Sequence, residues 1–129
     1  MGPRLDGWER RLDAVIIEDR PFEWGKSDCC KFAARCIKAM VGKDPSERWQ
    51  YADEYGAGRV LRKYGGVDGV ATFLFGPSKE PLTSNRGDLV MVEAPQRMLG
   101  ICIGHLVAIQ GSHGVEFVPL SSALKAWSI

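Results

Sequence analysis

The sequence predicts one α+β domain, in which a helical N-terminal half packs on a small antiparallel β-meander. Two observations predict it. Apolar residues recur at helical spacing through the first half of the chain, and the second half changes to short apolar runs separated by turns. The length of 129 residues is that of one compact domain, so we expect residues 1–129 to fold as a single unit.

Two amphipathic helices are predicted near the start of the chain. The first covers about residues 5–18 and carries one apolar stripe. The second covers residues 28–41, with Ser27 expected as its N-cap and Gly42 as its end. The apolar stripe of the second helix begins at Cys29, so this thiol is expected in the first turn of a helix.

Shorter helical pieces are predicted in the middle of the chain. Pro45 is well placed to open one that contains Trp49 and Tyr51. A second piece is closed by Gly65 and a third by Gly76. The polar segment that follows, up to Arg86, is predicted to be a surface loop.

Four short strands are predicted in the second half, at residues 88–93, 98–104, 106–110 and 115–119. Their connections are short, which favours antiparallel neighbours. After the last of them, Ser121 is expected to cap a final helical turn that holds Leu124 and Trp127.

The composition excludes several classes of protein. The 17 Lys and Arg residues nearly balance the 16 Asp and Glu residues, which argues against a nucleic-acid binder. No apolar run approaches the ~20 residues of a membrane helix, and the first residues lack a signal peptide. The four cysteines follow neither a metal-ligand nor a disulfide spacing, so we expect free thiols, no metal and no cofactor.

Three short motifs together resemble the NlpC/P60 family of cysteine peptidases. They are residues 24–29 (WGKSDC), 86–92 (RGDLVMV) and 99–104 (LGICIG). Their order and separation also resemble those of the family, over about residues 24–110. The whole chain further resembles a group of bacteriophage proteins encoded among tail genes. The resemblance implies a papain-like fold, synthesis in the host cytoplasm and a place in the virion tail.

The resemblance also assigns site residues. Cys29 takes the nucleophile position, where a helix N-terminus stabilises a thiolate. The position of the catalytic histidine falls at Met98, whose thioether cannot act as a base, and a shift of one residue would place Leu99 there. Gln110 takes the orienting position. Three further residues are candidates for the cleft: Trp24, Asp28 and Asp88.

Three hypotheses of function follow. The leading one is a structural or assembly component of a phage tail tip, built on an inactive peptidase fold and bound to other tail proteins. The alternative is an active cysteine amidase that cleaves peptidoglycan during genome delivery, with a base such as His105 in an unusual register or a histidine of a partner. The third is a metal or iron–sulfur module, which requires Cys102 to approach Cys29 or Cys36.

Overall fold

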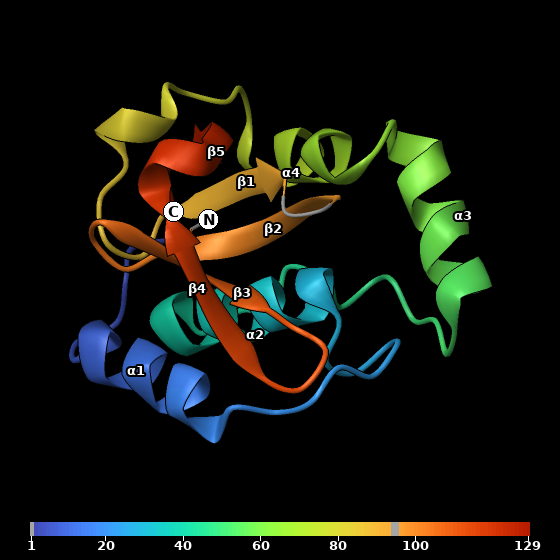
Figure 1. The fold of residues 1–129 in the computed structure, drawn as a ribbon, viewed down its shortest axis with the longest axis horizontal. Coiled ribbons are helices and arrows are strands. Elements are labelled where there is room, and N and C mark those ends of the chain that lie inside the picture. Colours follow the sequence, from blue (N-terminus) through green and yellow to red (C-terminus); the bar gives the residue numbers. More distant parts are fainter. Residues whose placement is uncertain (1, 94–95) are drawn as a thin grey trace.

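The computed structural model describes residues 2–93 and 96–129, and its architecture is α+β (Figure 1). The helices in this part of the chain are α1 (Trp8–Glu18), α2 (Cys29–Val41), α3 (Glu54–Tyr64) and α4 (Val67–Phe75), with short 3-10 turns η1 (Pro81–Thr83) and η2 (Leu120–Ser122). The two predicted long helices are therefore confirmed, and so are the short ones closed by Gly65 and Gly76.

The sheet is antiparallel throughout. Its strands are β1 (Leu89–Glu93), β2 (Arg97–Cys102), β3 (Leu106–Gln110), β4 (Val115–Pro119) and β5 (Ala123–Trp127). They lie in the order β4-β3-β2-β1-β5, so the predicted four-strand meander is confirmed and a fifth strand extends it beyond β1.

The predicted C-terminal helical turn is wrong, because residues 123–127 form β5. Consecutive residues of β5 face opposite sides of the sheet: Ala126 packs in one apolar cluster and Trp127 in the other, and both are fully buried. This alternation is that of a strand with both faces covered. Backbone hydrogen bonds between Lys79 and Ala126 cover the outer edge of β5.

The helix predicted from Pro45 is also absent, since residues 45–48 form turns and Trp49 follows them in irregular backbone. The carboxylate of Asp44 accepts hydrogen bonds from the backbone N–H of Ser46 at 2.9 Å and from its hydroxyl at 2.8 Å. Side-chain bonds of this kind offer the backbone an alternative to a helix.

The two faces of the sheet are buried in different ways. The face toward α2 forms the main core, to which Phe32 and Ile37 of α2 contribute, with α1 packed on the far side of α2. The opposite face holds a second cluster of aliphatic side chains, against which Leu120 and Ala123 pack. The α3 helix stands away from the sheet and packs mainly on α4 (Figure 1).

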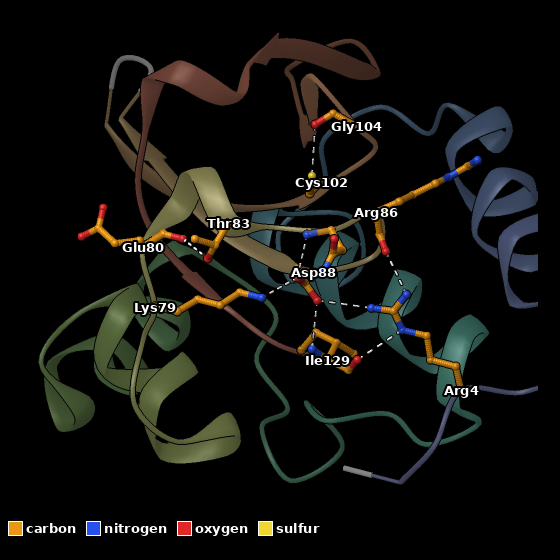
Figure 2. Close-up of polar contacts among 10 residues, drawn as sticks. Arg4, Lys79, Glu80, Thr83, Arg86, Asp88, Cys102, Gly104 and Ile129 are labelled. Atoms are coloured by element: carbon orange, nitrogen blue, oxygen red, sulfur yellow. Dashed lines mark hydrogen bonds and ion pairs between the residues drawn. The ribbon is translucent and has the colours of Figure 1, made fainter.

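Asp88 joins the two ends of the domain (Figure 2). Its carboxylate is buried and accepts hydrogen bonds from Arg4 at 3.2 Å, from Lys79 at 2.7 Å, and from the backbone N–H groups of Asn85 at 2.9 Å and Ile129 at 3.2 Å. The N-terminal segment, the loop before β1 and the C-terminus therefore meet at one charge.

We expect Asp88→Ala to lower the free energy of unfolding by about 2–4 kcal/mol, because it leaves two cations and two backbone N–H groups without their acceptor. The exposed pair Glu93–Arg97, 3.8 Å apart, provides the control: Glu93→Ala is expected to cost less than about 1 kcal/mol. Urea unfolding of both variants measures the difference. Equal losses in the two variants would contradict a central role for Asp88.

Candidate functional site

A pocket of about 320 Å³ opens between α2, α3, α4 and the strands β1 and β2. Aliphatic side chains from these elements line most of it; among them are Ile37, Val60, Leu61, Val70, Leu74 and Leu99. Its polar groups come from the start of α2, from the segment before α3, from Glu54 of α3, and from Gln96 and Arg97 where β2 begins. Two of the predicted cleft residues, Trp24 and Asp28, line this pocket together with Cys29.

Asp28 sets the position of Cys29. Its carboxylate is buried, with the side chain capping α2 through a hydrogen bond from the backbone N–H of Lys31 at 3.0 Å. It also accepts from the backbone N–H of Gly25 at 2.8 Å and from the hydroxyl of Tyr51 at 3.0 Å. Asp28 is therefore the N-cap, not Ser27 as the sequence predicted, and Cys29 is the first residue of the helix.

Gly25 is required where the loop meets this cap. Its φ of +80° lies in the left-handed region, and a Cβ at this position would stand 2.0 Å from the carbonyl oxygen of Tyr51. The close approach lets Gly25 and Tyr51 bind the same carboxylate. The Trp-Gly pair of the first motif thus has a structural explanation in the Gly25 backbone.

Cys29 and Cys30 form a pair of free thiols in the pocket, with their sulfur atoms 3.9 Å apart. A hydrogen bond from the Cys30 thiol lowers the pKa of Cys29, helped by the backbone N–H of Leu99, while burial and the Asp28 carboxylate oppose the shift. The same hydrogen bond and burial raise the pKa of Cys30 well above its ordinary value. These shifts favour the thiolate at Cys29 and the protonated thiol at Cys30.

Of the two residues that the resemblance offers for the base position, Leu99 lines the pocket of Cys29 and Met98 does not. Leu99 lines the pocket and belongs to the core beneath the sheet, whereas Met98 packs against the cluster on the opposite face. Neighbouring residues of a strand point to opposite sides, so only one of the two can reach the thiol. Met98, which the resemblance places at the base position, therefore lies on the face of the sheet away from the pocket.

Neither histidine is part of the pocket. His105 lies in the exposed turn between β2 and β3, and His113 in the exposed turn between β3 and β4. The unusual register that would bring His105 to the thiol is not observed, since β2 and β3 pair Ile101 with Ala108 and leave His105 in the turn.

Gln110 and Asp88 lie outside the pocket and hold the fold. Gln110 is buried on β3; its amide accepts a hydrogen bond from the hydroxyl of Ser27 at 3.3 Å and donates to the carbonyls of Arg20 at 2.7 Å and Gly111 at 2.9 Å. It fixes the segment that leads into Cys29. Asp88, predicted for the cleft, is instead the junction of the chain ends.

Cys36 and Cys102 are separated from the thiol pair. Cys36 is buried in the main core, where burial raises the pKa of its thiol to about 12. Cys102 lies on the opposite face of the sheet and donates to the carbonyl of Gly104 at 3.3 Å (Figure 2). The approach of Cys102 to Cys29 or Cys36 that a four-thiol site requires is therefore not observed, and no group of three or more potential ligands occurs among the described residues.

Comparison with protein families gives a match over nearly the whole chain. Residues 3–129 match the model of a family described as a domain of unknown function, DUF6950. The chain belongs to the DUF6950 family. The match covers the complete α+β domain of this DUF6950 chain, from the segment before α1 to the residues after β5. No curated protein matches it significantly. Within the described residues, every helix is too short or too polar to span a bilayer.

The sequence analysis of this DUF6950 chain missed Tyr51 and Lys31 as site residues. The ammonium of Lys31 donates to the hydroxyl of Ser46 at 3.2 Å and to the carbonyl of Trp49 at 2.8 Å, which fixes the segment carrying Tyr51 against α2. Lys31 follows the cap by three residues and could have been assigned to the same helix face. No sequence pattern indicates the approach of Tyr51.

The pH dependence of alkylation tests the thiol pair. In the native chain, Cys29 is expected to react with iodoacetamide with an apparent pKa lower than that of an unperturbed thiol. Cys30→Ala removes the donor that stabilises the thiolate, so the apparent pKa should rise. Cys29→Ser supplies the blank, and a profile unchanged by Cys30→Ala would disprove the pairing.

Proposed function

We propose that this chain is a structural component of a bacteriophage tail tip, built on an NlpC/P60-type peptidase scaffold that has lost its catalytic base. One observation carries the proposal: the pocket that holds a thiol at a helix N-terminus is lined by Leu99 and by no histidine, whereas a peptidase of this type needs an imidazole. The order of the three motifs supports the scaffold. Tail proteins are its partners, and the virion tail is its location.

The missing base matters because amide hydrolysis needs more than a nucleophile. A thiolate can attack a carbonyl carbon, but the amine that leaves must receive a proton in the transition state. Lys31 is held by Ser46 and Trp49, and the hydroxyl of Tyr51 is bonded to Asp28. Among the residues that line the described pocket there is no histidine to supply that proton as an imidazolium.

The lowered pKa of Cys29, a thiol at a helix N-terminus, favours one alternative, an active amidase that acts on peptidoglycan. It requires an imidazole from another chain, placed at the mouth of the pocket. Release of muropeptides by assembled particles, abolished by Cys29→Ala, is the result that this alternative demands.

Introducing a histidine into the pocket tests whether the scaffold can activate Cys29 as a cysteine peptidase does. Leu99→His is expected to place an imidazole beside Cys29, to lower the apparent thiol pKa further and to raise the alkylation rate at acidic pH. Met98→His is the matched control, because its side chain points to the other face of the sheet. Circular dichroism checks that both variants fold. An effect of Met98→His equal to that of Leu99→His would contradict the assignment of position 99.

Incorporation into particles tests the proposed role. We expect the chain in purified virions at constant copy number, and we expect Cys29→Ala particles to assemble and infect normally. Asp88→Ala, which weakens the fold away from the pocket, should reduce incorporation. Particles that lack the chain, or Cys29→Ala particles that assemble but fail to infect, would overturn a purely structural role.

A further inference from the structure

Most of the surface that lines the pocket is apolar. The thiols, Asp28 and Lys31 lie where α2 begins, and further along the same face of α2 come Ala33, Ala34 and Ile37. At 1.5 Å of rise per residue, this face extends roughly 10 Å from the thiol pair to Ile37. Aliphatic residues of α3 and α4, including Val60, form the opposite wall.

This shape fits a ligand with a reactive polar head and an apolar chain. The volume of about 320 Å³ lies at the lower end of small-molecule pockets, which span ~300–1,000 Å³. A peptide would bury its backbone amides against aliphatic walls that offer few partners, at a cost in free energy. A hydrocarbon chain has no such groups.

We propose that the pocket takes a medium-length acyl chain, bound to Cys29 as a thioester. The inference goes beyond the proposed function, because it concerns the isolated domain and does not depend on a place in a phage tail. It rests on the juxtaposition of a nucleophilic sulfur, its neighbouring thiol and an apolar cavity.

The donor is an acyl thioester. The Cys29 thiolate attacks the carbonyl carbon, the bond from that carbon to the donor sulfur breaks, and the donor leaves as a thiolate that takes a proton from water. One thioester replaces another, so no oxidant or reductant is needed. A thiolate also leaves without the proton that an amine requires, which is why this transfer proceeds without a histidine.

The same arrangement makes the product persistent. Hydrolysis of the thioester requires a water molecule activated by a base, and no histidine lines the described pocket. The backbone N–H of Leu99 lies by the sulfur, where it can donate to the oxyanion of the transfer step. The chain is thus an acceptor that reacts once and retains its acyl group.

A chain-length series tests the proposal. The purified chain is incubated with the coenzyme A thioesters of acetate, butyrate, hexanoate, octanoate, decanoate and dodecanoate, and adducts are followed by intact-mass spectrometry. Each methylene that enters the pocket should raise the rate about fourfold, until the pocket is full and the increase stops. One acyl group per chain is expected, and none in Cys29→Ser.

Two variants of α3 separate binding in the pocket from simple thiol reactivity. Val60→Trp adds bulk inside the pocket and should shift the preference to shorter acyl groups. Arg59→Trp, on the exposed side of the same helix, should leave the preference unchanged. Equal rates for all chain lengths, or an unchanged preference in Val60→Trp, would overturn the proposal. The proposal would also be overturned if Cys29 of the protein reacted with iodoacetamide but with none of the thioesters.

Discussion

The carboxylate of Asp28 is the group around which the site is built. It accepts hydrogen bonds from three donors in three different segments: the loop before α2, the first turn of α2 and the segment before α3. A buried carboxylate is tolerated only with such a set of donors, and the N-terminus of α2 stabilises it further. Without it, the start of the helix would lack its cap and the hydroxyl of Tyr51 its acceptor.

Asp28 also limits the reactivity that it makes possible. Its negative charge raises the pKa of the neighbouring Cys29, and burial acts in the same direction. The hydrogen bonds from Cys30 and from the backbone of Leu99 outweigh both. The thiolate therefore depends on a second cysteine and a strand backbone, where a cysteine peptidase relies on an imidazole, and this difference favours acyl transfer over amide cleavage.

Patterns within one element were predictable from the sequence, and contacts between elements were not. The α2 helix and the four-strand meander follow from period and turn residues. The β5 strand was missed because Leu124 and Trp127 stand at a spacing that also suits a helix, and only pairing with β1 decides between the two. The resemblance placed the base position at Met98, and a shift of one residue would place it at Leu99. Both residues are apolar, and which of them points toward α2 depends on how the sheet packs on that helix. The thiol position and Trp24 were predicted, whereas the burial of Gln110 and Asp88 in structural networks was not.

The junction at Asp88 has a consequence for the order in which the domain assembles during synthesis. The strand β1 obtains its neighbour β5, and Asp88 its bond from Ile129, only after residues 123–129 have left the ribosome. The side chain of Arg4, made more than a hundred residues earlier, needs the same carboxylate and the carbonyl of Ile129. Contacts of such long sequence separation form late. The nascent chain can form α2 early, but the bonds of Arg4 to Asp88 and Ile129 form only after the last strand has been made.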